Sequence, residues 1–287
     1  MKTKIEWTDY TWNFITGCTQ ISPACDNCYA KAMTKRLQGI DNKKTNFEKL
    51  SKYYQGWDQV VFHKDCLKDI LDKKKYPSGS KVFVNSMSDT FHEDINEWGG
   101  RMPMIFEYTK QRQDLIFQFL TKRSKTMFEF IKIAPDFMDK TLNDYYIKEM
   151  PKHCWFGVTA ENQEMADERI PELLNLRQFF GEQGKDLILF VSIEPMLEFM
   201  NIKKYLNDWG LNWVIVGGEN APKSKTREMN TYWVHSILEQ CKEYKIPLFF
   251  KQWGNYYNFK NKENYKLEPI EKEIESYKEF PKINKLK

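Results

Sequence analysis

Three cysteines lie within eleven residues near the start of the chain: Cys18, Cys25 and Cys28. Six residues separate the first from the second, and two separate the second from the third. Thiols spaced this closely in a chain without a disulfide framework indicate a metal or cluster site. Gly17 precedes the first cysteine and Pro23 lies before the second, which gives the segment the turn and the stiffness that a loop around a cluster needs.

The number of thiols favours iron and sulfur over zinc. A structural zinc site is normally closed by four ligands in two pairs, and the adjacent His153 and Cys154 have no spaced partner that would complete one. Three thiolates suit a 4Fe–4S cluster with one iron left for a non-protein ligand. We therefore expect Cys18, Cys25 and Cys28 to hold such a cluster, with zinc and a chance grouping as the alternatives.

The other three cysteines, Cys66, Cys154 and Cys241, are scattered through apolar or helical contexts, and we expect them to be buried small side chains. The first residues, MKTKIEWTDYTWN, are charged and aromatic and lack an apolar signal core. No stretch approaches the roughly 18 apolar residues of a membrane span. We therefore expect a cytoplasmic protein that does not bind membranes.

Short apolar runs alternate with segments of helical periodicity along the chain. The helical pattern is clearest after Pro171 and around Trp233 and Ile237. The six apolar runs begin at residues 81, 115, 154, 187, 213 and 247. Such runs are typical of strands that are buried on both faces of a parallel sheet. With an opening strand before the cysteines, the pattern predicts an α/β fold: a single, partial TIM-like barrel of about seven mostly parallel strands with an N-terminal cluster-binding loop.

No repeat or low-complexity linker divides the chain. We expect the barrel to occupy residues 1–255, with the cluster loop at 17–30 and a Lys-rich helical insert at about 41–75. Residues 256–287 are rich in Lys and Glu and are expected to form a charged C-terminal extension.

A polar cluster follows each apolar run, and ligands of parallel α/β folds bind at the carboxyl ends of strands. These clusters lie at residues 85–89, 121–123, 159–162, 192–195, 217–220 and 251–254. Six such ends predict an active-site mouth. The alternative for any one cluster is structural: Gly217, Gly218 and Pro195 would turn the chain, and Asn162 would cap a helix.

Net charge is +4, from 44 basic and 40 acidic residues, which is too small an excess to identify a nucleic-acid-binding protein. Aromatic residues make up 15% of the chain. Most of them are expected in the core, and a few exposed rings could stack on bases.

Several motifs together resemble a known family. The opening runs are 5–13 (IEWTDYTWN), 16–18 (TGC), 22–23 (SP) and 28–30 (CYA). The later runs are 85–89 (NSMSD), 120–123 (LTKR), 166–171 (ADERIP), 192–195 (SIEP), 217–219 (GGE) and 251–254 (KQWG). Over roughly residues 1–255 this pattern resembles the bacteriophage and prophage three-cysteine-motif family, which is similar to radical S-adenosylmethionine (SAM) proteins. The CYA end is also similar to spore photoproduct lyase. The chain departs from the usual radical-SAM spacing in its six-residue first gap and in Asn27, where an aromatic residue is expected.

The resemblance implies a 4Fe–4S enzyme that cleaves SAM reductively. It places cofactor-binding groups at the strand ends: Asn85, Ser86, Thr159, Glu161, Arg169, Ser192, Glu194, Gly217 and Gly218. Arg169 could instead pair with an acid on its own helix, and Glu219 could simply cap a turn.

The remaining rim groups are candidates for catalysis and substrate binding: Asp89, His92, Lys122, Arg123 and Lys251. The three cations would suit a phosphate or another anion. We expect partners to include SAM, a nucleotide or nucleic-acid substrate, and an electron donor such as flavodoxin or ferredoxin. Salt bridges at the barrel mouth are the structural alternative. The alternative function is a phage nucleic-acid-binding protein that carries iron–sulfur or zinc without catalysis.

Overall fold

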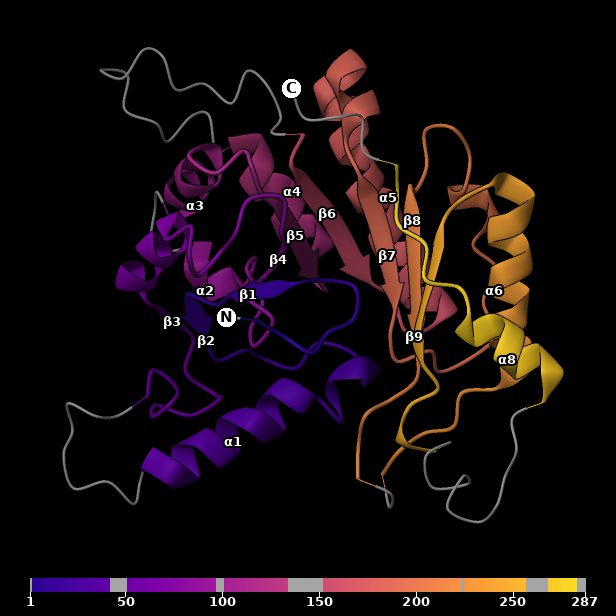
Figure 1. The fold of residues 1–287 in the computed structure, drawn as a ribbon, viewed down its shortest axis with the longest axis horizontal. Coiled ribbons are helices and arrows are strands. Elements are labelled where there is room, and N and C mark those ends of the chain that lie inside the picture. Colours follow the sequence, from indigo (N-terminus) through magenta and orange to yellow (C-terminus); the bar gives the residue numbers. More distant parts are fainter. Residues whose placement is uncertain are drawn as a thin grey trace. The chain divides into compact units, whose positions relative to one another are not determined.

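The computed structural model describes residues 2–41, 51–96, 101–133, 152–222, 225–256 and 268–282. Seven strands form a parallel sheet in the order β1-β4-β5-β6-β7-β8-β9 (Figure 1). Their bounds are β1 Tyr10–Trp12, β4 Lys81–Val84, β5 Ile116–Thr121, β6 Cys154–Thr159, β7 Leu189–Ile193, β8 Trp213–Gly217 and β9 Leu248–Gln252. Every strand predicted from an apolar run is present. The α/β class and the partial TIM-like barrel are confirmed.

A second, small sheet pairs β2 (Ile15–Thr16) with β3 (Val61–Phe62) in antiparallel fashion. The helices alternate with the strands. The α-helices are α1 Tyr29–Asp41, α2 Glu93–Asn96, α3 Arg101–Lys110, α4 Ser124–Ile133, α5 Gln163–Phe180, α6 Thr231–Tyr244 and α8 Pro269–Glu275. The 3-10 helices are η1 Pro23–Cys25, η3 Lys64–Leu71, η4 Gly181–Asp186 and η5 Lys203–Tyr205.

The chain divides into two compact units. Unit 1 comprises residues 1–21 and 28–154, and unit 2 comprises residues 22–27 and 155–287. The loop that carries the three cysteines, residues 17–28, therefore contributes to both units. We call this segment the cysteine loop.

Aromatic packing forms the core of each unit. In unit 1, the Trp12 ring lies 4.6 Å from Phe14 and 5.7 Å from Phe117, centroid to centroid. In unit 2, the fully buried Trp213 of β8 has the rings of Trp155 and Phe190 at 5.8 and 5.5 Å. Burial of such rings supplies much of the hydrophobic stabilisation of a sheet. The apolar runs thus lie in the sheet interior, as their composition predicts.

Two Asn side chains begin the long helices of unit 2. Asn162 accepts a hydrogen bond from the Met165 N–H at 2.8 Å, and Asn230 accepts one from the Tyr232 N–H at 2.8 Å. Such caps satisfy N–H groups that have no partner inside the helix. The structural alternative for Asn162 is therefore confirmed, and α5 begins eight residues before Pro171, which lies inside it.

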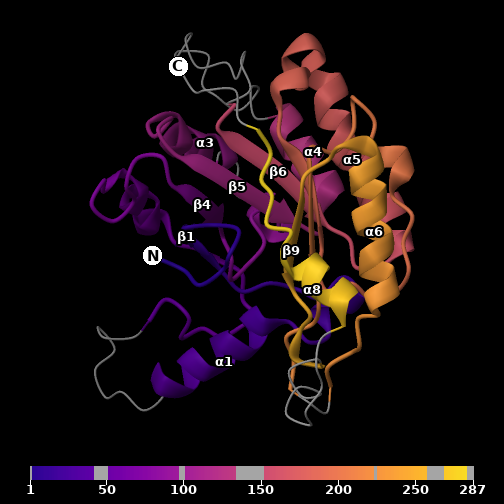
Figure 2. The same cartoon turned by 45° about the vertical axis from the view of Figure 1, so that its right-hand side comes forward.

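The predicted insert and extension have ordered parts. Within about 41–75 the described residues form β3 and η3, and Asp41 ends α1. Within 256–287, α8 packs against α6 and β9 (Figure 2), and Lys278 forms a β-bridge with Phe249. Residues 42–50, 257–267 and 283–287 lie outside the described residues. In the described parts, no helix combines the length and apolarity needed to cross a membrane.

The scattered cysteines follow the prediction in two cases. Cys154 and Cys241 are buried, and burial raises the pKa of Cys154 to about 12. Cys66 is half-buried instead, because it lies on the short 3-10 helix η3 rather than in the sheet.

The close packing of unit 2 yields a stability prediction at Gly157 in β6. A Cβ atom there would lie 2.5 Å from the ring of the buried Phe190. Gly157→Ala should lower the free energy of unfolding by about 1–3 kcal/mol, as other overpacked cores do. Urea denaturation measures the change.

Gly39→Ala in α1 is the matched control, because no atom lies within 4 Å of its added Cβ. Alanine favours a helix over glycine by up to about 1 kcal/mol, so this variant should be equal to or more stable than the wild type. A Gly157→Ala protein as stable as the wild type would contradict the packing.

Candidate functional site

The first turn of the cysteine loop is fixed by backbone contacts in unit 1. Gly17 has a φ of +80°, and a Cβ there would lie 1.9 Å from the Gln59 carbonyl oxygen. The Ser88 hydroxyl donates to the Gly17 carbonyl, and the Cys18 N–H donates to the Trp57 carbonyl at 3.0 Å. Only glycine fits this position, so the turn that presents Cys18 depends on Gly17.

Arg123 follows β5 and contacts the Cys18 side chain. Its Nη1 lies 3.7 Å from Cys18 Sγ, and its Nη2 donates to the Thr19 carbonyl and hydroxyl at 3.2 and 2.7 Å. Nη1 also donates to Asp89 at 3.2 Å, and Nε to Glu93 at 2.7 Å. Burial opposes the charge of this guanidinium, but Asp89, the Cys18 thiol and Glu93 outweigh it and raise the Arg123 pKa. Arg123 therefore stays positively charged, and this charge lies beside Cys18 and Thr19.

Asp89 is held entirely by neighbouring donors. The Thr121 hydroxyl donates to its two oxygens at 2.7 and 2.9 Å, and the Phe91 and Lys122 N–H groups donate at 3.0 and 3.3 Å. The Asp89 side chain is 9% exposed. Its carboxylate thus orients Arg123 instead of lying open to a substrate.

His92 also contacts the cysteine loop. Its Nε2 lies 2.8 Å from the Thr19 hydroxyl, and its Nδ1 accepts the Asp94 N–H at 3.2 Å. This pattern assigns the proton to Nε2. Burial, and then the charge of Arg123, lower the His92 pKa, so the neutral ring is favoured near pH 7. Both ring nitrogens are therefore engaged, and His92 supports Thr19.

In unit 2, a carboxylate at the end of β6 holds the segment before Cys25. Glu161 is fully buried and accepts the Ala24 N–H at 3.0 Å. Arg169 donates to Glu161 at 3.1 Å and to the Thr159 carbonyl at 2.8 Å. Burial alone would raise the Glu161 pKa, but hydrogen bonds from residues 22–24 and the Arg169 charge lower it. The predicted SAM contacts Glu161 and Arg169 therefore form a buried pair that anchors the loop.

A second carboxylate, Glu219 after β8, holds the segment beyond Cys25. It accepts the Asn27 side-chain amide at 3.0 Å and the Arg227 N–H at 2.9 Å, and it pairs with the Arg227 guanidinium. Arg227 in turn donates to the Pro23 carbonyl at 3.0 Å. Glu219 thus does more than cap a turn: it binds the cysteine loop through the side-chain amide of Asn27. Neither Arg227 nor Thr19 carries a sequence signal, because their roles depend on contacts across the fold.

Glu194 after β7 and Lys251 of β9 form an ion pair, each side chain 19% exposed. A Cβ at Gly217 would lie 3.3 Å from Glu194 Cδ, so this glycine leaves room beside the pair. The Gly218 N–H donates to the Gln252 carbonyl at 2.8 Å. Glu194 was predicted to bind SAM and Lys251 to bind the substrate; in the structure their charges neutralise one another.

The remaining predicted cofactor contacts lie at strand ends. Asn85 accepts the N–H groups of Phe14 and Ile15 at 2.9 and 3.1 Å and donates to Thr90 at 3.0 Å, so its oxygen and one of its two N–H groups are engaged. The half-buried Ser86 donates to Asn13 at 3.2 Å. Of the other predicted residues, Thr159 and Ser192 are buried at the ends of β6 and β7, and Lys122 is half-buried.

The donor set of the cysteine loop fits an iron–sulfur cluster in its chemistry. Cys18, Cys25 and Cys28 are each half-buried, and Cys18 faces a buried cation that would stabilise a thiolate. Among the described residues, no three His, Cys, Asp or Glu side chains are arranged as a metal site. The thiol count and the fixed loop, rather than the sulfur positions, therefore favour a cluster.

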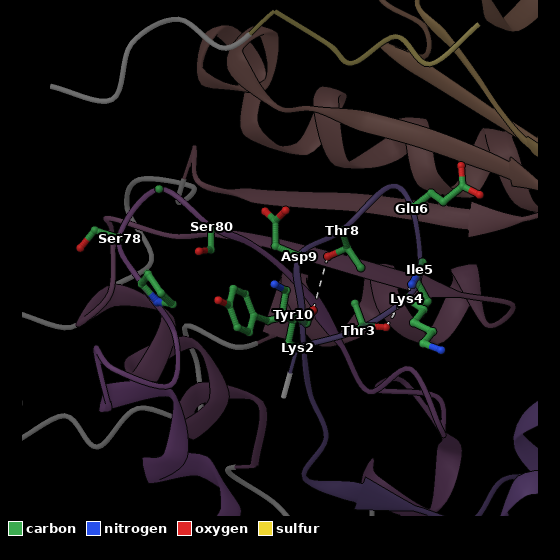
Figure 3. A pocket seen from close by; sticks show the side chains of 12 residues that line it. Lys2, Thr3, Lys4, Ile5, Glu6, Thr8, Asp9, Tyr10, Ser78 and Ser80 are labelled. Atoms are coloured by element: carbon green, nitrogen blue, oxygen red, sulfur yellow. Dashed lines mark hydrogen bonds between the residues drawn. The ribbon is translucent and has the colours of Figure 1, made fainter. Parts of the chain in front are cut away.

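An open groove of about 570 Å³ lies at the opposite ends of the unit 1 strands (Figure 3). It is lined by residues before β1 and β4, including Thr8, Asp9 and Ser78. These groups bond within the chain: Thr8 and Asp9 to Lys81, and Ser78 to Asp114. Because it lies at the opposite strand ends of unit 1, the groove is separate from the end of β5, which Arg123 follows.

The loop contacts yield a prediction for Glu219→Ala. Loss of this carboxylate removes the acceptor of Asn27 and Arg227, so backbone amides of residues 22–27 should exchange with deuterium at least tenfold faster. Tenfold corresponds to about 1.4 kcal/mol, at the lower end for a hydrogen bond to a charged group. Mass spectrometry of the metal-free protein measures it.

Glu198→Ala is the control, because Glu198 also accepts a backbone N–H, that of Gln163 at 2.8 Å, but in an exposed position and from a residue outside the segment 22–27. Its segment 22–27 should exchange as in the wild type. Unchanged exchange in Glu219→Ala would show that Glu219 does not hold the loop.

Three comparisons with known proteins bear on the chain. A family model described as a protein of unknown function, DUF5131, matches residues 2–281. No curated protein matches. A solved structure of a spore photoproduct lyase mutant with dinucleoside spore photoproduct matches at 9% identity and a TM-score of 0.49, over 88% of this chain and 78% of that one. Identity and TM-score are both too low for this match to indicate a function.

Proposed function

Since the chain belongs to the DUF5131 family, which is described only as of unknown function, we propose a function from its own residues. It is a radical SAM-type enzyme: Cys18, Cys25 and Cys28 hold a 4Fe–4S cluster, and SAM is its cofactor. The observation that carries this proposal is the cysteine loop, whose Cys18 turn is held by Arg123 and whose Cys25 segment is held by Glu161 and Glu219. When bound, the cluster would supply the electron that cleaves SAM.

The chain's own part is to fix the thiols. A three-ligand loop must present its sulfurs reproducibly, and functional groups on loops need supporting contacts from rigid elements. Here the supports come from residues that follow β5, β6 and β8. Because these supports are buried charges with matched partners, the loop has little freedom to rearrange. This is what a cluster-binding loop requires.

SAM binding is assigned to the strand-end groups that remain accessible. Glu194 is partly exposed, and Gly217 leaves space beside it, so its carboxylate can accept hydrogen bonds from the ribose or adenine of SAM. Ser86 and the buried Thr159 and Ser192 are further contacts in this proposal. Glu161, paired with Arg169, binds the backbone of the cysteine loop. Asn85 binds the backbone N–H groups that follow β1.

A nucleotide or nucleic-acid substrate stays a prediction. Two of its three rim cations are already paired, Arg123 with Asp89 and Glu93, and Lys251 with Glu194. The exposed rings of Phe199 and Tyr232 stack on one another, 5.9 Å apart. The structural alternative of salt bridges at the strand ends is thus present, and it weakens the argument from phosphate binding.

Substitution of the loop cysteines tests the cluster. Cys18→Ala, Cys25→Ala and Cys28→Ala should each abolish iron loading after anaerobic reconstitution, since a cluster with three protein ligands does not tolerate losing one. Cys66→Ala, Cys154→Ala and Cys241→Ala should load iron like the wild type. Iron and sulfide analysis with the visible spectrum measures loading.

Two results would refute this assignment. One is loss of iron from a variant of the second group as complete as from the first. The other is a colourless wild-type protein that contains zinc, which would favour the non-catalytic alternative. A brown protein that cleaves SAM when reduced supports the enzyme.

Glu194→Gln tests the SAM site. It should weaken SAM binding by more than tenfold, about 1.4 kcal/mol, because a charged acceptor is lost, and it should leave the cluster spectrum unchanged. Calorimetry on the loaded protein measures the affinity, with Glu198→Gln as the control. Equal affinity in Glu194→Gln and wild type would assign Glu194 a structural role.

A further inference from the structure

Arg123 uses its full set of donors, and one of them points at a cysteine sulfur. A guanidinium has five N–H groups. Nε donates to Glu93, Nη2 to the carbonyl and hydroxyl of Thr19, and Nη1 to Asp89 and to Cys18 Sγ. These five contacts match the five donors one to one. The direction of the N–H toward sulfur is therefore set by four other bonds.

The surroundings make this contact specific to Cys18. Arg123 is 5% exposed, so little water competes for its donors. Among the described residues, no arginine contacts the sulfur of Cys25 or Cys28. A cluster held by three thiolates carries negative charge, and one further electron increases it. Hydrogen bonds to the sulfurs and nearby charge both govern the reduction potential of such clusters.

We propose that Arg123 is a positioning residue that holds Cys18 and makes the cluster easier to reduce, by donating an N–H to the Cys18 sulfur. This inference rests on the proposed iron–sulfur function. The added electron comes from an external donor, and no atom is transferred. The guanidinium charge stabilises the reduced, more negative cluster over the oxidised one. Asp89 and Glu93 set its orientation, so their effect on the cluster passes through Arg123.

The test is a redox titration of the reconstituted protein with dithionite, followed by the electron paramagnetic resonance signal of the reduced cluster. In Arg123→Gln, the ratio of reduced to oxidised cluster at a fixed potential should fall at least tenfold. For a one-electron couple, tenfold is about 59 mV. Arg123→Lys, which keeps the charge but has three donors instead of a planar fork, should lie between Arg123→Gln and the wild type.

Arg112→Lys is the matched control. Arg112 is a buried guanidinium of the same unit, which bonds the Ile70 and Tyr76 carbonyls and Asp114. Its partners in the described part of the chain include no cysteine. Its substitution disturbs a comparable network, so the potential should equal that of the wild type. A shift as large as that of Arg123→Gln would show that general loosening, and not the sulfur contact, moves the potential.

Arg123→Gln leaves Asp89 without its cation, and such a change can prevent folding. The Asp89→Asn/Arg123→Gln double variant removes both charges and should show the same fall in reduced cluster. If neither protein folds, Arg123→Lys decides: a potential equal to that of the wild type overturns the proposal. Failure of the wild type to load iron would refute the proposed function instead, whereas loaded variants with unchanged potentials would refute only the role of Arg123.

Discussion

Charge burial at the ends of the strands is the constraint on which the rest of this protein depends. Asp89, Glu161 and Glu219 are carboxylates that follow buried segments and have almost no contact with water. Each is paired with an arginine: Arg123, Arg169 or Arg227. A buried ion is tolerated only with a partner and further hydrogen bonds, and here part of those bonds comes from the cysteine loop. The sheet and the loop therefore stabilise one another.

This dependence works in both directions. Removing one partner of a buried pair typically costs about 3–5 kcal/mol, because the other charge is left uncompensated. The loop gains a fixed conformation that its own residues do not supply, since η1 has no side-chain cap and spans three residues. In return, the loop supplies hydrogen-bond partners to side chains at the strand ends that would otherwise be unsatisfied. A loop held in this way is suited to presenting thiols, and poorly suited to opening and closing.

The sequence predicts the elements of this fold better than the use of its polar groups. The strands are readable because runs such as residues 213–217 are apolar on both faces, and the structure places them inside the sheet. Asn162 as a helix cap is readable too, since the contact is local. Arg123, Asp89 and His92 were predicted to meet a substrate, because a polar side chain after a strand gives no sign of its partner. Their partners lie up to 105 positions away in the chain, and only the fold brings them together.

Buried pairing also limits which side chains can bind a ligand. A side chain that binds a ligand needs unused donors or acceptors, and the buried pairs have few left. Among the predicted rim residues, Ser86, Lys122, Glu194 and Lys251 combine partial exposure with polar atoms. The last two neutralise one another, so a ligand at that position would have to compete with an existing ion pair or join it. A group with both donors and acceptors, such as the ammonium and carboxylate of an amino acid, satisfies both partners, whereas a phosphate satisfies only the lysine. The Glu194–Lys251 pair therefore favours a ligand that carries both donors and acceptors over a simple anion.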